Sequence, residues 1–245
     1  MNIGIIPARL ASNRFPKKIL AILDGKPMIA HVMEKALKAE KLDKVILAID
    51  SEETQEALND FDFEMIMTSQ EHLSGTDRVA EVVQGIEEAK VIINIQGDEP
   101  LVDPNVIDGL VDTFQDPAVN MATVVSRKLI VNDLLNPNVV KAILDEKRNA
   151  VEFKRNIFDL EIGGVYRHIG MYGFHRKTLF HFTVLEPSIR EQKRKLEQMR
   201  ALDNDISIRA LITACDSWAV DTKEDLNKVA QIMGVSIETA VEQDG

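Results

Sequence analysis

The sequence has only one cysteine, Cys215, among its 245 residues. A single cysteine rules out an intrachain disulfide framework, and such scarcity is typical of proteins in a reducing cytoplasm. Long hydrophobic runs are also missing: no apolar segment approaches the length of a membrane span, and no charged-then-apolar leader opens the chain. We therefore expect a cytoplasmic protein that has no disulfide framework and does not enter a membrane.

Positive charge is scarce, because Lys and Arg together number 29 against 40 Asp and Glu, for a net charge of -11. The phosphates of nucleic acids and anionic membranes repel such a chain, so neither is an expected partner. Internal repeats and low-complexity tracts are absent as well. The hydrophobic content of 45% allows a substantial core, and the length suits one large α/β domain or a domain with a small lobe.

Short apolar, β-branched segments alternate with amphipathic segments along much of the chain. This alternation predicts a parallel sheet with buried strands and flanking helices. The expected strands are residues 3–6, 44–49, 63–67, 91–95, 121–125, 150–153 (an edge strand), 166–174 and a segment ending near 218–220. The expected helices begin near 28, 51, 74, 104 and 222, with one long charged helix over 187–203, and residues 156–165 should form a loop.

Four cations follow the first expected strand: Arg9, Arg14, Lys17 and Lys18. In open α/β sheets, ligands bind outside the carboxyl ends of the strands. Arginine can form forked hydrogen bonds to phosphate oxygens, and lysine supplies a compact positive charge. Both residue types at this place suit the binding of a polyphosphate. The alternative is an ordinary basic surface turn.

Two carboxylates, Asp98 and Glu99, follow the strand expected at 91–95. Two adjacent carboxylates at the end of a central strand do not suit burial in a hydrophobic core. They suit Mg²⁺, which prefers one or two carboxylates together with substrate phosphates and waters. A purely structural turn is the alternative.

Two further segments carry polar residues at expected element ends or faces. Ser74 or Thr76 is a candidate cap for the helix that follows, which would direct N–H groups at an anion, although capping alone also explains them. In the strand 166–174 a period of two places His168, Gly170, Tyr172 and Phe174 on one face. His175 falls on the other face, so the two histidines cannot share a metal site, and a lone strand histidine is usually structural.

Several of these segments together resemble the cytidylyltransferases that activate 3-deoxy-manno-octulosonate (Kdo). The opening segment 7–18 (Pro-Ala-Arg-Leu-Ala-Ser-Asn-Arg-Phe-Pro-Lys-Lys) fits the family pattern, with Lys17 in place of a usual glycine. The resemblance extends from Ile5 to Leu226. It includes 72–78 (His-Leu-Ser-Gly-Thr-Asp-Arg), 96–100 (Gln-Gly-Asp-Glu-Pro), 136–141 (Asn-Pro-Asn-Val-Val-Lys), 167–173 (Arg-His-Ile-Gly-Met-Tyr-Gly), 196–200 (Leu-Glu-Gln-Met-Arg) and 220–226 (Val-Asp-Thr-Lys-Glu-Asp-Leu).

The resemblance implies an α/β fold: a single nucleotide-binding domain over 1–245, with a mostly parallel, twisted central sheet flanked by helices and a small β-rich lobe near 136–185. It implies transfer of CMP from CTP to the anomeric hydroxyl of a 3-deoxy ulosonic acid, with release of pyrophosphate, for lipopolysaccharide biosynthesis. Mg²⁺ is the implied cofactor, and a homodimer with the lobe at its interface is the implied assembly.

The resemblance also implies roles for individual residues. Arg9, Lys18 and Asp98 would be catalytic, and Asp98 and Asp221 would be the metal ligands. The nucleotide would be bound by Pro7, Ala8, Arg9, Ser12, Arg14, Lys18, Ser74, Gly75, Thr76, Arg78 and Gln96. The sugar would be bound by Arg155, His168, Tyr172, Glu197 and Gln198, with Arg155 gripping the substrate carboxylate.

Two other functions stay open: a nucleotidyltransferase for another substrate, such as a sialic-acid-like sugar, and a noncatalytic nucleotide-binding protein. Departures from the family at Glu152, Lys154 and Arg194 raise the hypothesis that the sugar carries an amino group, as in 8-amino-Kdo, with Glu152 as the partner of its ammonium. The alternative is that these three side chains face solvent and do not affect the substrate.

Overall fold

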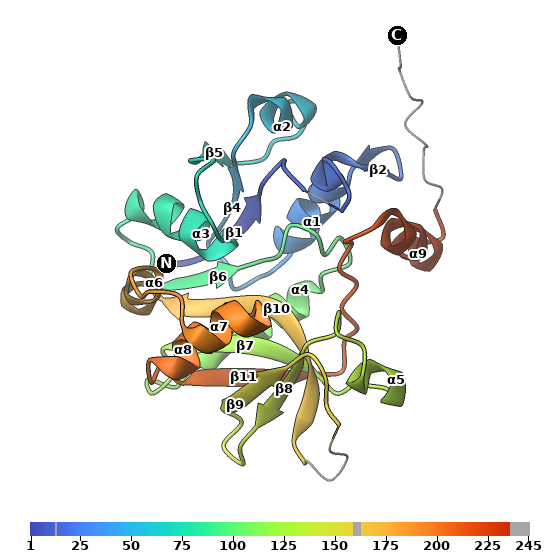
Figure 1. Cartoon of the computed structure of the whole chain (residues 1–245). Coiled ribbons are helices and arrows are strands. Elements are labelled where there is room, and N and C mark those ends of the chain that lie inside the picture. Colours follow the sequence, from blue (N-terminus) through green and yellow to red (C-terminus); the bar gives the residue numbers. More distant parts are fainter. Residues whose placement is uncertain (13, 159–162, 236–245) are drawn as a thin grey trace. The chain divides into compact units, whose positions relative to one another are not determined.

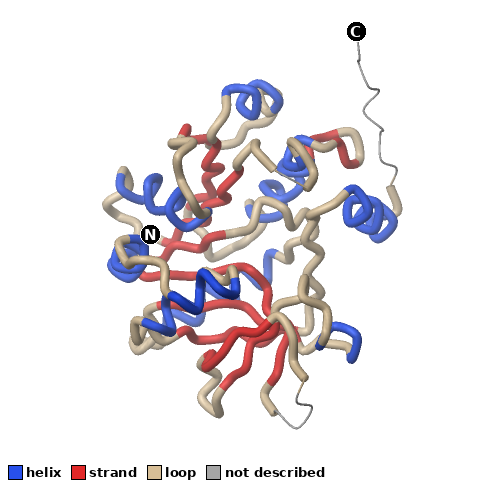
Figure 2. The backbone as a smooth tube through the Cα atoms, viewed as in Figure 1, coloured by secondary structure: helices blue, strands red, loops and turns tan. Residues whose placement is uncertain are grey.

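The computed structural model describes residues 1–12, 14–158 and 163–235 (Figures 1 and 2). Its internal contacts divide the chain into two compact units. The first unit comprises Met1–Asn2, Glu88–Ile93 and Asn105–Asp216, and the second comprises Ile3–Glu87, Asn94–Pro104 and the chain from Ser217 onward. The single domain with a lobe at 136–185 stays a prediction.

Within its described residues, the second unit contains three parallel strands, two of which are buried along most of their length. β1 (Asn2–Ala8) pairs with β4 (Lys44–Ile49), and β4 pairs with β5 (Met65–Met67), all in parallel. The runs of Ile, Val and Leu in β1 and β4 suit strands that are covered on both faces. A hairpin of β2 (Ile22–Leu23) and β3 (Lys26–Pro27) turns through Asp24-Gly25, both at positive φ.

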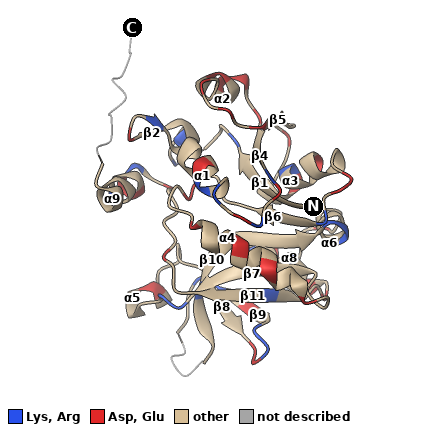
Figure 3. Cartoon of the chain, turned by 180° about the vertical axis from the view of Figure 1, so that it is seen from behind, with Lys and Arg blue, Asp and Glu red and all other residues tan. Residues whose placement is uncertain are grey.

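Side chains cap three helices of the second unit, as the sequence predicts. Ser51 caps α2 (Glu52–Ala57), whose acidic first turn is red in Figure 3. Ser74 caps α3 (Gly75–Gln84) by accepting a hydrogen bond from the Asp77 N–H. Thr222 caps α9 (Lys223–Met233) through a reciprocal capping box with Asp225. The unit also holds α1 (Met28–Ala36) and the 3₁₀ helix η1 (Lys18–Leu20).

The first unit is built on strands in the order β11-β7-β10-β6, with β8 paired to β10 and β9 paired to β8. β7 runs parallel to β11 and antiparallel to β10. Among the described strands β9 pairs only with β8, which confirms the predicted edge strand. The bounds are β6 (Val91–Asn94), β7 (Met121–Ser126), β8 (Lys141–Leu144), β9 (Ala150–Lys154), β10 (Val165–His175) and β11 (Ile208–Thr213).

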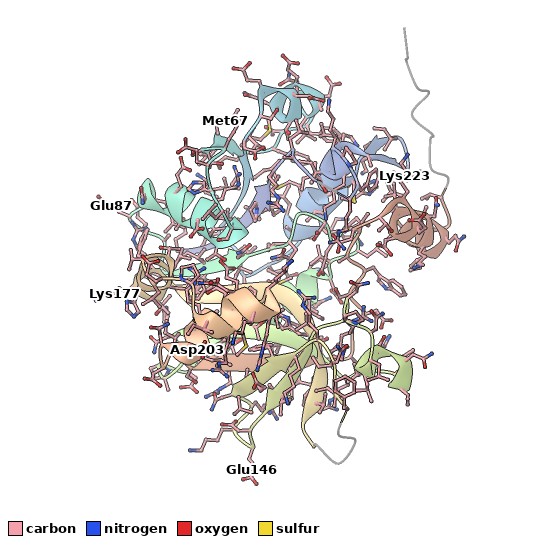
Figure 4. All side chains as sticks on the ribbon, viewed as in Figure 1. Met67, Glu87, Glu146, Lys177, Asp203 and Lys223 are labelled. Atoms are coloured by element: carbon pink, nitrogen blue, oxygen red, sulfur yellow. The ribbon has the colours of Figure 1, made fainter. Side chains whose placement is uncertain are left out.

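The helices of the first unit are mostly short. They are α4 (Pro104–Asp112), η2 (Thr113–Gln115), α5 (Val131–Leu134), α6 (Arg176–Thr183), α7 (Ile189–Arg194) and α8 (Gln198–Asp203). Asp203, labelled in Figure 4, ends α8 and forms an ion pair with Arg190 of α7. Among the described residues, no helix has both the length and the apolar character needed to cross a bilayer.

Two sequence predictions about elements are wrong. The long helix expected over 187–203 is two helices, because Lys195 ends α7 in a left-handed conformation with φ 53°. The strand expected to end near 218–220 is not formed, since β11 ends at Thr213 and an irregular segment follows. That segment is instead held by a hydrogen bond from the Val220 N–H to the Asp98 carbonyl. The overall α/β class, with helices and mostly parallel strands, is confirmed.

The faces of β10 follow the predicted alternation despite an irregularity. His168 lies opposite Val125 of β7 and Tyr172 lies opposite Thr123, so β10 carries extra residues between them. The extra length is an even number of residues, so His168 and Tyr172 stay on one face. Ring centroids 5.5 Å apart for His168 and Tyr172, and 6.3 Å apart for Tyr172 and Phe174, confirm the shared face.

Candidate active site

A cavity of about 470 Å³ lies within the second unit. Four segments line it: the loop after β1, the start of α3, the turn after β6 and Asp221 before α9. The predicted nucleotide-binding residues on its wall are Pro7, Arg9, Ser12, Arg14, Lys18, Ser74, Gly75, Arg78 and Gln96. The structure thus gathers most of the predicted nucleotide residues around one hollow large enough for a small-molecule ligand.

Two of the predicted nucleotide residues do not line the cavity. Ala8 is completely buried in β1. Thr76 is buried in the first turn of α3, where its hydroxyl accepts a hydrogen bond from the Asn94 side-chain amide at 3.3 Å. Their contact with a nucleotide stays a prediction. Five residues not predicted also line the wall: Ala11, Ile19, His72, Leu73 and Gly97.

Close backbone approaches shape the floor of the cavity. A Cβ atom on Gly97 would lie 2.9 Å from the carbonyl oxygen of Pro7, a distance that real Cβ contacts do not tolerate. A Cβ on Gly75 is only 3.2 Å from the Pro7 ring. Gly97 therefore permits the turn after β6 to lie against the end of β1, which places Gln96 and Asp98 beside the basic loop.

Lys18 links the two predicted metal ligands. Its ammonium donates to Asp98 Oδ2 at 2.7 Å, to Asp221 Oδ1 at 3.1 Å and to the Val220 carbonyl at 2.9 Å. Arg14 forms an ion pair of 2.8 Å with the other oxygen of Asp221. The structure thus brings Arg14, Lys18, Asp98 and Asp221 into one alternating network of charges, although the two aspartates are 123 positions apart in the sequence (221 − 98).

The carboxylate pair fits a divalent cation only in part. Both Asp98 and Asp221 place an oxygen within hydrogen-bonding reach of one ammonium, so they converge on a single cation. Within the described ranges, however, no group of three or more His, Cys, Asp or Glu residues is arranged to hold a metal. Two carboxylates completed by substrate phosphates and waters is the donor set that Mg²⁺ prefers. The residues therefore fit Mg²⁺ when a phosphate ligand is also bound.

A buried ion pair supports the cavity wall, to which its arginine, Arg78, belongs. Arg78 has a side chain only 3% exposed, and its Nη2 lies 2.9 Å from Asp50 Oδ2. The other oxygen of Asp50 accepts the Leu10 N–H at 2.9 Å, and Arg78 Nη1 donates to the Thr68 hydroxyl. Asp50 thereby connects the start of the basic loop to α3. Sequence reasoning missed Asp50, although its position directly after a predicted buried strand, like that of Asp98, was a usable signal.

His72 and Glu81 form a second polar pair at this edge of the unit. The His72 Nε2 atom contacts a Glu81 carboxylate oxygen, which also accepts the Ser69 N–H. Desolvation opposes ionisation of Glu81, but these hydrogen bonds outweigh it and lower the pKa of the carboxyl. Because His72 lines the cavity, the pair fixes one side of its wall.

The predicted sugar residues His168 and Tyr172 lie in β10 of the first unit. Removal from water lowers the pKa of His168 to about 3, so the ring is neutral at pH 7. Its Nε2 lies 3.0 Å from the Thr123 hydroxyl. Burial, aided by the negative charge of Glu197, raises the pKa of Tyr172 well above its ordinary value. Both side chains therefore offer neutral hydrogen-bonding groups.

Arg155 uses its guanidinium on main-chain carbonyls. Nε donates to the Arg194 carbonyl at 2.9 Å, Nη1 to Pro137 at 2.9 Å and Nη2 to Lys195 at 3.0 Å. Three of the five N–H donors of a guanidinium are thus engaged, which leaves one on each terminal nitrogen. Arg155 consequently links its own strand end to Pro137 and to residues 194–195. Its contact with a substrate carboxylate stays a prediction.

Glu152 and Arg194 pair with each other. Arg194 Nη1 lies 2.5 Å from Glu152 Oε1, and the two side chains are 31% and 22% exposed. The alternative that these side chains simply face solvent does not hold for Glu152 and Arg194, because each is partly buried against the other. Gln198 is almost fully buried in the first turn of α8, directly after Glu197.

Comparison with known proteins identifies the family to which this chain belongs. A family model described as cytidylyltransferase matches residues 3–208. The chain is 43% identical to the 3-deoxy-manno-octulosonate cytidylyltransferase of Pelobacter propionicus, over 94% of this chain and 97% of that protein. It is 41% identical to the enzyme of the same name from Geobacter sulfurreducens, over 94% and 99% of the two chains.

Solved structures agree with the sequence comparison. CMP:2-keto-3-deoxy-manno-octonic acid synthetase complexed with CTP superposes with a TM-score of 0.89 at 35% identity, covering 95% of this chain and 98% of that one. The inositol-1-phosphate CTP transferase from T. maritima, at 19% identity and a TM-score of 0.67 over 96% and 97% of the chains, shares the fold. The chain therefore belongs to the cytidylyltransferase family and is a nucleotidyltransferase.

Proposed function

We propose that the protein transfers CMP from CTP to the anomeric hydroxyl of Kdo and releases pyrophosphate. The observation that carries this proposal is the cavity of the second unit, which cations and two aspartates line. All of its lining residues except Asp221 fall within residues 3–208, which the family model matches. Relatives named 3-deoxy-manno-octulosonate cytidylyltransferase at about 40% identity support the choice of sugar. By the same reasoning the product serves lipopolysaccharide synthesis, and the single cysteine supports a location in a reducing cytoplasm.

The reaction is an in-line displacement at phosphorus. The sugar oxygen forms a new bond to the α-phosphorus of CTP, the bond from that phosphorus to the bridging oxygen breaks, and the hydroxyl proton passes to solvent. Arg9 and Lys18 neutralise the charge that grows on the departing pyrophosphate, and Arg14 supports them. No side-chain nucleophile is needed, because positioning and charge stabilisation supply the rate enhancement.

Asp98 and Asp221 are the residues that would hold Mg²⁺, since both carboxylates converge on one cationic position. When bound, the ion supplies Lewis-acid polarisation of phosphate oxygens and neutralises charge. Around it, Gly97 keeps the turn close to β1, and the hydrogen bond from Val220 to Asp98 keeps Asp221 beside Asp98.

The sugar-binding group is proposed to be Arg155, His168, Tyr172, Glu197 and Gln198. One feature of the first unit supports this group: His168 and Tyr172 are neutral and lie on one face of β10, which suits recognition of uncharged hydroxyl groups.

The proposed substrate is plain Kdo rather than 8-amino-Kdo. Glu152 already forms an ion pair with Arg194, so it is not available as the partner of a ligand ammonium.

A homodimer is the proposed assembly. The first unit exposes large apolar side chains on and near α5, including Val131 at 78% and Phe158 at 82%. Ile130 and Leu135 are also exposed, and the Ile157 N–H donates to the Leu134 carbonyl, which keeps this segment beside α5. Such a group of exposed apolar residues favours contact with a second copy of the chain.

The test is to incubate the protein with each nucleoside triphosphate, with and without Mg²⁺, and with Kdo, 8-amino-Kdo and a sialic acid, and to measure pyrophosphate. We expect release only with CTP, Mg²⁺ and Kdo. Release with another sugar acid would change the proposed substrate. No release with any combination, together with a thermal shift specific to CTP, would indicate a noncatalytic nucleotide-binding protein.

A further inference from the structure

The Lys18 ammonium has no unused hydrogen-bond donor. An ammonium carries three N–H groups, and here they reach Asp98, Asp221 and the Val220 carbonyl at 2.7, 3.1 and 2.9 Å. The Lys18 side chain is only 14% exposed, although the rim residue Arg14 is 61% exposed. In the free protein, therefore, the lysine is fully committed to the two aspartates.

This commitment conflicts with both roles proposed for the site. One ammonium cannot contact the departing pyrophosphate while all three of its donors are used on the protein. Nor can Asp98 and Asp221 take Mg²⁺ at about 2.0–2.1 Å while Lys18 occupies the space between them. Two cations at such short separation also repel each other strongly.

We propose that Lys18 keeps divalent metal away from Asp98 and Asp221 until the triphosphate of the nucleotide draws the ammonium off them. The phosphates then bind Lys18, the two aspartates become available, and the metal enters with the nucleotide. Lys18 thereby sets the order of binding at the site. This inference rests on the proposed use of Mg²⁺.

The local structure allows the side chain to move without moving the loop. Lys18 begins η1, while Lys17 before it has a left-handed backbone with φ 53° and an ion pair of 2.6 Å to Glu53 of α2. Lys17 therefore gives the main chain a contact of its own with α2, and the flexible four-carbon stem of Lys18 allows its ammonium to change partners. Lys17 also provides a matched control, since it has the same charge in the same loop but no contact with either aspartate.

The first test measures Mn²⁺ binding by electron paramagnetic resonance in the absence of nucleotide. We compare the wild-type protein with Lys18→Met and Lys17→Met. We expect Lys18→Met to bind Mn²⁺ at least about tenfold more tightly than the wild type, and Lys17→Met to stay within about twofold. Equal Mn²⁺ affinity in Lys18→Met and the wild type would overturn the proposal.

A second measurement needs no variant. In protein labelled with ¹⁵N-lysine, an ammonium held by three acceptors exchanges its protons slowly and gives a distinct NMR signal. We expect CTP with a chelator to shift or broaden this signal and Mg²⁺ alone to leave it unchanged. Loss of the signal with Mg²⁺ alone would show that the metal displaces Lys18 unaided, which contradicts the proposal.

The controls separate this inference from the proposed function. Mn²⁺ bound by the wild type with CTP but not by Lys18→Met alone would remove the gating role and leave the metal site intact. No Mn²⁺ binding to the wild type even with CTP would remove the metal site itself, and the gating role with it.

Discussion

The protein handles charge in opposite ways in its two units. Around the cavity of the second unit, Arg14, Lys18, Asp98 and Asp221 form ion pairs with one another and remain partly accessible. In the first unit, burial lowers the pKa of His168 and raises that of Tyr172, so both side chains are neutral. Arg155 there donates three of its five N–H groups to main-chain carbonyls. Accessible, paired charges suit a ligand as highly charged as a triphosphate. Fixed neutral groups suit the hydroxyls of a sugar. The following experiments test this contrast.

The largest effect is expected where the two carboxylates converge. Asp98→Asn and Asp221→Asn replace an anionic oxygen with a weaker amide ligand for a hard cation. We expect Mg²⁺-dependent turnover to disappear while circular dichroism and thermal melting report a folded protein. Folded variants with unchanged dependence on Mg²⁺ would move the metal site elsewhere.

Removal of the cations should come next in size. Arg9→Ala and Lys18→Ala each delete a cation that we propose stabilises the departing pyrophosphate. Losing one such contact commonly costs roughly 3–4 kcal/mol, or about a hundred- to thousandfold in kcat. Lys17→Ala is the control in the same loop and should keep kcat within about threefold. Near-native turnover of Lys18→Ala at saturating CTP would disprove its catalytic role.

The support beneath the cavity predicts a mixed effect. Asp50→Asn keeps a hydrogen-bonding oxygen but leaves Arg78 without its buried counter-charge. We expect a loss of about 2–3 kcal/mol in unfolding free energy and a higher KM for CTP, because the Leu10 N–H and the basic loop lose their fixed partner. Denaturant unfolding and steady-state kinetics measure the two effects. An unchanged KM would limit Asp50 to a structural role.

The neutral state of His168 predicts acid sensitivity. Its folded pKa of about 3 lies below the ordinary value of 6.5, so the unfolded chain binds the proton more readily. The stability contributed by the neutral ring is complete above pH 6.5 and is lost as the pH falls toward 3, by about 1.4 kcal/mol per unit. His168→Gln should flatten this slope between pH 6.5 and 5 in urea unfolding. His181→Gln, at an exposed position of α6, should not.

The smallest effect is expected at Glu152. Its ion pair with Arg194 is partly exposed and should contribute about 1 kcal/mol or less. We expect Glu152→Gln to leave kcat/KM for Kdo within about threefold and to leave any preference between Kdo and 8-amino-Kdo unchanged. A specific loss of activity toward 8-amino-Kdo would instead restore the hypothesis that Glu152 binds a sugar ammonium.

The sequence by itself determined the α/β class, the parallel strands β1 and β4, and the caps Ser51, Ser74 and Thr222. These depend on local rules: β-branched runs, the period of two and the preference of hydroxyls for helix starts. The carboxyl ends of neighbouring parallel strands meet at one edge of a sheet, which indicated the basic loop and Asp98 as site residues. The resemblance to the cytidylyltransferases supplied most of the other residues that line the cavity.

Only the tertiary structure decided which side chains contact one another in and around the site. Nothing local places Lys18 between Asp98 and Asp221, or Asp50 between Leu10 and Arg78, since these contacts join segments far apart in the chain. Nor did periodicity foresee the break at Lys195, where a residue other than glycine takes the left-handed conformation. The neutral state of His168 likewise follows from burial, which depends on the packing of many residues rather than on its own neighbours in sequence.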